Sequence, residues 1–366
     1  MAERSDYALE SGKFAEVDAP ELRFEPPRPK AKHAIALVGA GGISFAHLDA
    51  YRRHGLDVAV IMSRDRAKAA ASAAEFFPDA EVTTDFERLL RRDDIEVLDL
   101  TPHPEDRLPL IEAALRAGKH VLSQKPFVTD LDTGERLVAL ADAQGVKLAV
   151  NQNGRWAPHL AWMREAVRAG LIGEVLGVHC SLHWNHMWVK GTPFEQVDDL
   201  LLFDFGIHWF DFVTSIMGRC ADRVQAQALQ VPSAAIRTPM LASALLDFGS
   251  AQSSLVFDAA TPYGPSDTTY IAGSKGSLVS HGPDLGQQTV ELYIENGLAR
   301  PTLEGKWFND GFAGSMGALL VAIESGSEPE NGARSNLLSL ANTFAALRAA
   351  ATGQAQVPGL VRSGAS

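Results

Sequence analysis

Cysteine is scarce in this sequence, because Cys180 and Cys220 are the only two in 366 residues. Two cysteines cannot build a disulfide framework, which favours a reducing compartment and a cytoplasmic protein. No run of 18 apolar residues is present, so no membrane span is expected. Basic residues are outnumbered, with 33 Lys and Arg against 45 Asp and Glu. The resulting net charge of −12 argues against a nucleic-acid or anionic-membrane partner.

The length of the chain exceeds what one hydrophobic core usually serves, so two domains are expected. We expect a polar arm over residues 1–30, a first domain over residues 31–151 and a second over residues 152–366. The arm is rich in proline and charge, and is expected to lie on the surface or to reach a neighbouring subunit.

A glycine-rich turn follows the first strong apolar run. Residues 35–38 predict a buried parallel strand, and an amphipathic helix is expected over residues 45–53, with Ser44 at the third position of the turn motif. A strand, a glycine turn and a helix N-terminus direct backbone N–H groups at one point, where a pyrophosphate can bind. The candidates for this contact are Gly39, Gly41, Gly42 and Ile43.

Short apolar runs alternate with amphipathic stretches as far as Asn151, which predicts βαβ units and a doubly wound parallel sheet, a Rossmann domain. The expected strands are 35–38, 58–62, 97–100, 121–123 and 147–150, and the expected helices are 45–53, 66–77, 86–91, 105–117 and 131–144. Beyond Asn151 successive strands lack intervening helices, which predicts an α+β domain with a large, mostly antiparallel sheet. Its expected strands are 174–188, 223–230, 241–248, 252–259, 268–272, 277–280 and 290–294, with helices at 158–169, 205–217, 312–324 and 337–351.

Two segments carry candidate chemistry. Lys125 follows a strand at the carboxyl edge of the parallel sheet, where ligands bind in this architecture, and Pro126 restrains it. Asp204 and His208 are four residues apart, so they share one face of a helix and could bind a hydroxyl group and move its proton. The alternatives are a solvated lysine beside a turn, and a helix-capping aspartate with a core histidine.

These segments together resemble the Gfo/Idh/MocA family of NAD(P)-dependent oxidoreductases (glucose-fructose oxidoreductase, inositol dehydrogenase, MocA). Residues 38–43 resemble its dinucleotide motif, residues 117–126 its aGKHVl-x-EKP segment, and residues 204–211 its D-x-G-x-H-x-x-D helix. The resemblance covers nearly everything from Ala34 to the C-terminal region. It implies hydride transfer between a secondary hydroxyl of a sugar, sugar derivative or cyclitol and a nicotinamide.

The resemblance also implies that Lys125, Asp204 and His208 line the active site. His208 would be the general base, Lys125 would stabilise the charge on the reacting oxygen, and Asp204 would bind a neighbouring hydroxyl or orient the site. Gln124 replaces the family's usual glutamate, which removes one charge beside the site. An Asn-x-Arg element, here Asn153, Arg155 and the following Trp156, is implied to contact cofactor or substrate.

Further candidates follow from strand ends. Ser63 stands where an NAD enzyme usually places an acid, and Arg64 follows it, which tilts the cofactor from NAD toward NADP, although Asp65 is one step away. The remaining candidates are Thr101, His103 and Gln124 for the cofactor, and His183 and Trp184 for the walls of a sugar site. The histidine-rich stretch from 179 to 188 lacks convergent zinc-ligand spacing, so no metal is expected.

Two other functions remain open from the sequence. A bound NAD could be used transiently, to permit elimination or glycoside cleavage of a sugar. A cofactor-binding sensor without catalysis is the other alternative, although the chain keeps Lys125 and His208 and is acidic. Exposed sheets in such second domains commonly pair, so a homo-oligomer through the C-terminal sheet is expected.

Overall fold

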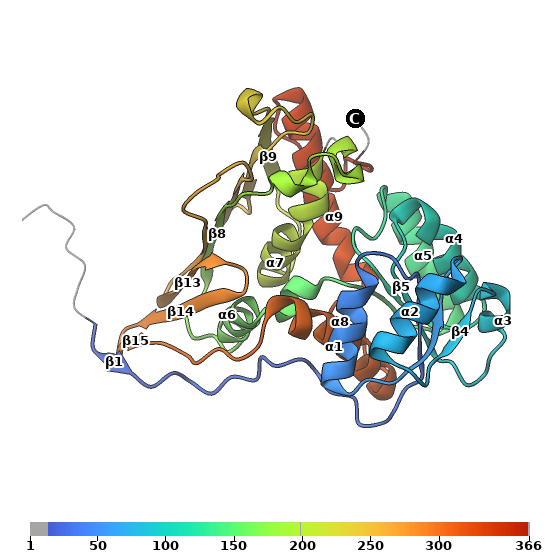
Figure 1. The fold of residues 1–366 in the computed structure, drawn as a ribbon. Coiled ribbons are helices and arrows are strands. Elements are labelled where there is room, and N and C mark those ends of the chain that lie inside the picture. The colour runs from blue at the N-terminus through green and yellow to red at the C-terminus, as the bar shows by residue number, and fades with distance from the viewer. Residues whose placement is uncertain (1–13, 198, 365–366) are drawn as a thin grey trace, which may run out of the picture.

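Residues 14–197 and 199–364 are described by the computed structural model, and they build two sheets with helices packed on them (Figure 1). The first sheet is parallel throughout, with the order β4-β3-β2-β5-β6-β7. Its strands are β2 (Ile35–Val38), β3 (Val58–Met62), β4 (Glu81–Thr83), β5 (Val97–Leu100), β6 (His120–Ser123) and β7 (Leu148–Val150). The helices between them are α1 (Ser44–His54), α2 (Arg66–Phe76), α3 (Phe86–Leu90), α4 (Pro104–Arg116) and α5 (Leu131–Gln144).

The predicted Rossmann fold is therefore confirmed. The chain builds outward from β2 through β3 to β4, and then returns to the other side of β2 with β5. This change of direction leaves the carboxyl ends of β2 and β5 side by side without a crossover helix between them, which is where such sheets bind ligands. Strand β4 escaped the sequence prediction because its three residues form no apolar run.

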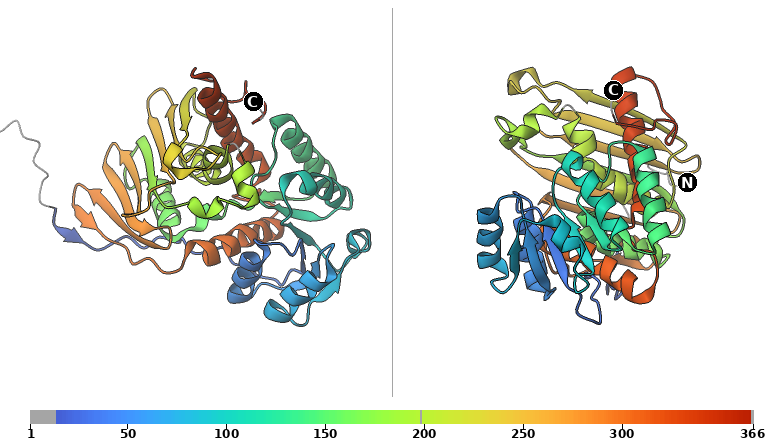
Figure 2. Two further views of the ribbon diagram at one scale, coloured as in Figure 1. Left: turned by 45° about the horizontal axis from the view of Figure 1, so that its top comes forward. Right: turned by 90° about the vertical axis from the view of Figure 1, so that its right-hand side faces the viewer.

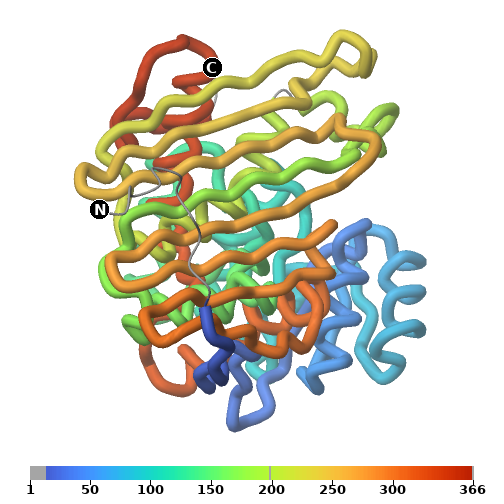
Figure 3. The backbone as a smooth tube through the Cα atoms, turned by 90° about the vertical axis from the view of Figure 1, so that its left-hand side faces the viewer, coloured from blue at the N-terminus to red at the C-terminus, as the bar shows by residue number. Residues whose placement is uncertain are grey.

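The second sheet has nine strands in the order β1-β15-β14-β13-β12-β8-β11-β10-β9 (Figure 3). Its pairs are antiparallel except β8 with β11 and β1 with β15, as predicted for a mostly antiparallel sheet. Its strands are β1 (Glu16–Val17), β8 (Val175–His183), β9 (Arg223–Leu229), β10 (Leu241–Asp247), β11 (Gln252–Asp258), β12 (Ser266–Gly273), β13 (Gly276–Asp284), β14 (Gln287–Ile294) and β15 (Gly297–Ala299).

Helices cover one face of this second sheet, and the strands form the opposite side of the molecule (Figures 1 and 3). The covering helices are α6 (Pro158–Arg168), α7 (Ile207–Met217) and α9 (Ala333–Thr352). Short helical turns join them: η1 (Asn153–Trp156), η2 (Met187–Val189), η3 (Pro193–Gln196), the π-helix η4 (Leu200–Phe205) and η5 (Pro232–Ala234). The helix predicted from residue 205 thus begins as a π-turn, and the strand predicted to residue 188 ends at His183.

A helix from late in the sequence completes the first sheet. Helix α8 (Trp307–Ser325) packs beside α1, and its Phe312 and Met316 share a core with Ile35 and Leu37 of β2 (Figure 2). The described part of the N-terminal arm lies along its own chain, from the β1–β15 pair to the end of α8, where the carboxylate of Glu324 accepts backbone hydrogen bonds. Helix α8 and the described part of the N-terminal arm therefore both connect the second sheet to the first.

No helix among these residues is long and apolar enough to cross a membrane.

Candidate active site

The glycine turn after β2 has the geometry of an anion-binding cradle. Gly39 has φ +105°, and a Cβ there would stand 2.5 Å from the Thr101 hydroxyl, so only glycine fits. Gly41 and Gly42 are exposed, and a Cβ on either would meet nothing within 4 Å. Helix α1 begins after Ile43 with no side-chain cap and no acidic residue in its first turn. This uncapped helix N-terminus and the open approach over Gly41 and Gly42 therefore fit a pyrophosphate.

The second strand end at the crevice is held by Thr101. Its hydroxyl donates to the carbonyl oxygens of Val38 and Gly39 at 3.1 and 2.9 Å, which ties the ends of β5 and β2 together. Thr101 therefore holds the backbone of the glycine turn in place from its buried side. His103 is exposed at the start of α4, at the same edge of the sheet.

The end of β3 offers a hydroxyl and a guanidinium. Ser63 is buried, and the Arg64 side chain is 87% exposed with one contact to Asp106 at 3.1 Å. The Asp65 carboxylate caps α2, where it accepts from the backbone N–H groups of Ala67 and Lys68. Asp65 is thus engaged with its own helix.

Lys125 and Asp204, predicted to share the active site, are in direct contact. The Lys125 Nζ donates to the Asp204 backbone oxygen at 2.8 Å and lies 3.3 Å from its carboxylate Oδ1. The two side chains are 18% and 20% exposed, so both remain accessible. Asp204 belongs to the π-turn that precedes α7, and the Lys125–Pro126 peptide bond is cis.

His208 lies at the start of α7 against a tryptophan wall. Its ring meets Trp307 edge-on at 5.6 Å between centroids, and Trp307 in turn donates to the Asn153 side-chain oxygen at 3.1 Å. A Cβ on Gly154 would lie 3.0 Å from Trp307 and 3.6 Å from the His208 Cβ, so glycine allows this close approach. Burial, and then the charge of Lys125, lower the pKa of His208 well below its usual value. The imidazole is therefore neutral near pH 7 and able to accept a proton.

A buried polar network stands behind Lys125. Gln124 turns inward, and its Oε1 accepts the Lys125 backbone N–H at 2.7 Å. The Gln124 Nε2 lies 3.3 Å from His47 Nε2, and His47 Nδ1 lies 2.7 Å from the carboxylate of Asp99. Asn151 and Tyr51 complete the network. Gln124 thus supports the position of Lys125 from inside. No local sequence pattern marks His47 and Asp99, which lie 52 residues apart.

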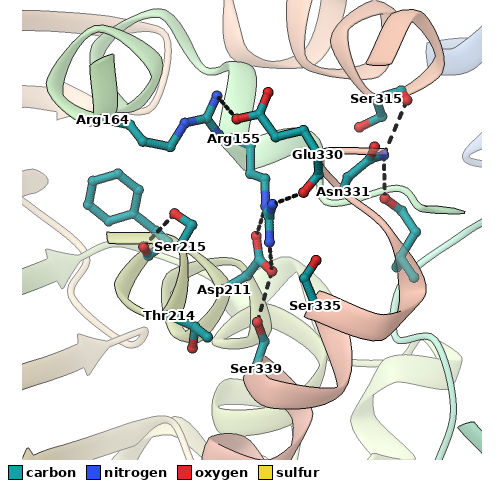
Figure 4. Close-up of polar contacts among 12 residues, drawn as sticks. Arg155, Arg164, Asp211, Thr214, Ser215, Ser315, Glu330, Asn331, Ser335 and Ser339 are labelled. Atoms are coloured by element: carbon teal, nitrogen blue, oxygen red, sulfur yellow. Dashed lines mark hydrogen bonds and ion pairs between the residues drawn. The ribbon is translucent and has the colours of Figure 1, made fainter. Parts of the chain in front are cut away.

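The structure does not bring Arg155 to this site. Arg155 is 5% exposed, and its guanidinium donates to both carboxylate oxygens of Asp211 at 2.6 and 2.9 Å and to the Glu330 backbone oxygen (Figure 4). Ser339 donates to the same Asp211 carboxylate at 2.9 Å. Every one of these groups is engaged within the fold, so Arg155 joins η1, α7 and α9. Trp156 is likewise 2% exposed and packs on Gly314 of α8.

His183 and Trp184, the two candidates from the histidine-rich stretch, lie on opposite faces of the nine-stranded sheet. His183 points to the uncovered face of the nine-stranded sheet, where its ring contacts Ser181 and Asp258. It does not meet Lys125. Trp184 turns to the helix-covered side and lies 5.6 Å from the Trp209 ring of α7, next in sequence to His208. The following His186 is near enough to Asp204 for the carboxylate to act on its pKa.

The parallel sheet with its glycine cradle, and Lys125, Asp204 and His208 as the candidate active-site group, place the chain in the class of dinucleotide-dependent oxidoreductases. The model of the oxidoreductase family with an NAD-binding Rossmann fold matches residues 33–152, and the Gfo/Idh/MocA C-terminal domain model matches residues 160–279. The chain belongs to the Gfo/Idh/MocA family of oxidoreductases.

Two characterised relatives are similar over most of their length. A D-apiose dehydrogenase of Paraburkholderia graminis is 25% identical over 323 residues, 84% of each chain. An inositol 2-dehydrogenase of Rhizobium meliloti is 25% identical over 87% of this chain and 96% of its own. An Agrobacterium radiobacter oxidoreductase solved with NAD+, L-tartaric acid and magnesium has a TM-score of 0.80 at 22% identity, covering 90% of this chain and 99% of that one. A levoglucosan dehydrogenase in complex with NADH and levoglucosan has a TM-score of 0.78 at 17% identity, with 90% and 100% covered.

Proposed function

We propose that the protein oxidises a secondary hydroxyl of a sugar, sugar derivative or cyclitol, reversibly, with a nicotinamide cofactor. The observation that carries this proposal is the contact of Lys125 with Asp204 beside a neutral, half-buried His208, at the sheet edge next to the glycine cradle. The names of the apiose, inositol and levoglucosan dehydrogenases support the substrate class.

Each of the three side chains has a distinct part. A bound nicotinamide would supply the hydride acceptor. The His208 imidazole accepts the hydroxyl proton, since its lowered pKa keeps it unprotonated. The Lys125 ammonium donates a hydrogen bond to the same oxygen and stabilises the negative charge that develops there. Asp204 holds that ammonium in place and accepts from a neighbouring hydroxyl.

NADP is the cofactor we favour, by a small margin over NAD. Arg64 is exposed at the end of β3, and the nearest carboxylate in sequence, Asp65, is committed to capping α2. An arginine there suits a 2′-phosphate, whereas NAD enzymes usually present an acid to the ribose. The Arg64→Ala variant should weaken NADPH binding at least tenfold and leave NADH binding unchanged, as measured by calorimetry. An equal effect on both cofactors would overturn the preference for NADP.

The activity is tested with a panel of sugars, cyclitols and sugar acids, each supplied with NAD and with NADP. Formation of the reduced nicotinamide is followed by its absorbance. The proposal expects at least one sugar or cyclitol to be oxidised, and expects Lys125→Ala and His208→Asn to abolish that signal. If no compound of the panel reduced NAD or NADP, in protein that binds the cofactor, net oxidation would be contradicted.

We further propose that the uncovered face of the nine-stranded sheet pairs with a second copy of this chain. Four large apolar side chains are 40–57% exposed on this face: Leu176, Leu229, Leu245 and Tyr270. A surface hollow of about 500 Å³ is lined by Leu176 and Leu245 together with the charged pair Arg223 and Asp247. Such a face can match its own copy about a two-fold axis. Leu245→Glu should therefore reduce the mass measured by light scattering to that of a smaller assembly, and an unchanged mass would contradict this interface.

A further inference from the structure

Aromatic rings form a continuous row from His208 to the surface. Successive ring centroids along it lie 5.6, 5.7, 5.6, 6.0 and 5.0 Å apart. The row comprises, in order, His208, Trp307, Trp209, Trp184, His186 and Trp188. These residues come from α7, α8 and the segment after β8, so the fold assembles the row from distant parts of the sequence.

The rings next to His208 are covered by the fold, whereas the outer end of the row is exposed. Trp307 and Trp209 are 3% and 2% exposed, whereas Trp188 is 54% exposed. The Trp188 ring is supported from behind by Phe194, at 5.5 Å between centroids. An exposed, supported indole presents a flat apolar face, which is the surface that stacks on a sugar ring or an aryl group.

The middle of the row carries polar atoms that lack partners. Trp184 Nε1 and His186 Nε2 are buried and have no hydrogen-bond partner among the described residues. Leaving such atoms unpaired costs free energy, so they mark places where oxygen atoms of a ligand or of water complete the bonding. His186 also packs on Phe205 at 4.0 Å, which fixes its ring next to the segment that carries Asp204.

The charges at the Lys125 end of the row are paired with each other. The ammonium of Lys125 faces the carboxylate of Asp204, and Arg155 is committed to Asp211. Burial lowers the pKa of His186 to about 4 although Asp204 acts in the opposite direction, so this ring is neutral near pH 7. A carboxylate or phosphate on the substrate would thus meet Asp204 without an unpaired cation from these residues. The reacting end of the row therefore suits an uncharged sugar ring.

We propose that the row extends substrate recognition beyond the reacting ring, and that the substrate is a neutral saccharide carrying a second ring. The reacting ring lies against Lys125 and His208, Trp184 and His186 bind hydroxyl oxygens, and the second ring, sugar or aryl, stacks on Trp188. This inference rests on the proposed function, because it assumes that the reacting carbon lies at His208.

The test is equilibrium binding to the cofactor-loaded protein by calorimetry. The probes are the phenyl β-glycosides of glucose, galactose, mannose and xylose, each compared with its free sugar. At least one glycoside should bind about tenfold more tightly than its sugar, as expected for one added stacking contact. In Trp188→Ala this ratio should fall to about one. Phe14→Ala is the matched control, because Phe14 is 48% exposed on the other side of the sheet and should leave the ratio unchanged.

Charge is tested with glucuronate and glucose 6-phosphate against glucose. Both anions should bind at least tenfold more weakly than glucose, and tighter binding of either anion would overturn the assignment of a neutral ligand. Absence of any glycoside preference, or a preference that survives Trp188→Ala, would overturn the second-ring contact. Either failure leaves the proposed function standing if the sugar panel reduces the nicotinamide. A glycoside preference that Trp188→Ala removes, without any reduction of the nicotinamide, would refute the proposed function and leave only the ring contact at Trp188.

Discussion

Replacing Arg155 with alanine tests whether this residue forms a structural ion pair or contacts the substrate. If its role is structural, the free energy of unfolding should fall by a predictable amount. The guanidinium makes two hydrogen bonds to Asp211 and one to the Glu330 carbonyl, and the Arg155 and Asp211 side chains are 5% and 1% exposed. Removing one partner of such a pair leaves a buried, uncompensated charge, which costs about 3–5 kcal/mol. Arg155→Ala should therefore lower the free energy of unfolding in urea by this amount.

The double variant Arg155→Met with Asp211→Leu is the control, since it removes both charges and fills the space. It should lose less stability than Arg155→Ala, because no isolated charge remains. The reasoning would be refuted if Arg155→Ala unfolded at the same urea concentration as the parent while its KM for substrate rose. That result would indicate that Arg155 contacts the substrate, as the family resemblance implies.

Three further outcomes are expected. Lys125→Ala should lose about two to three decades in kcat, because a donor to the developing oxyanion disappears, with little change in cofactor affinity by calorimetry. Gly39→Ala should lower the melting temperature, since its Cβ collides with Thr101, whereas Gly41→Ala should keep the melting temperature and lose cofactor affinity. Burial lowers the pKa of His159 to about 3, so the unfolded state binds the extra proton below pH 6.5. Unfolding free energy should then fall as pH decreases from 6.5 toward 3, by up to about 1.4 kcal/mol per pH unit for this residue, with a shallower fall in His159→Gln.

The parallel sheet was predictable because its strands are short, apolar and bounded by glycine or polar residues. Five of its six strands match the predicted bounds or lie within one residue of them, at β2, β3, β5, β6 and β7. Likewise, the four-residue spacing of Asp204 and His208 and the strand end before Lys125 were enough to nominate these three residues as candidates. The contact of Asp204 with Lys125 depends on a π-turn, which no periodicity marks.

Side-chain direction was the part that local patterns could not supply. Arg155 and Trp156 follow a strand at the ligand-binding edge, yet the buried carboxylate of Asp211, 56 residues further on, draws the guanidinium into the core. His183 alternates with buried Leu182, and which of these faces inward depends on helices that come later in the sequence. The placement of α8 on the first sheet is likewise a long-range contact.

The central claim is that a neutral His208 accepts the substrate proton, and the pH dependence of kcat/KM for oxidation tests it most directly. Burial and the Lys125 ammonium lower the pKa of His208 well below 6.5, so the imidazole should remain unprotonated and the wild-type rate should show no acid limb between pH 6 and 8. His208→Asn should reduce the rate by about two to four decades over that whole range, with cofactor affinity retained. An acid limb centred at or above pH 6.5 that vanishes in His208→Asn, or a variant that keeps most of the parent's rate, would contradict the claim.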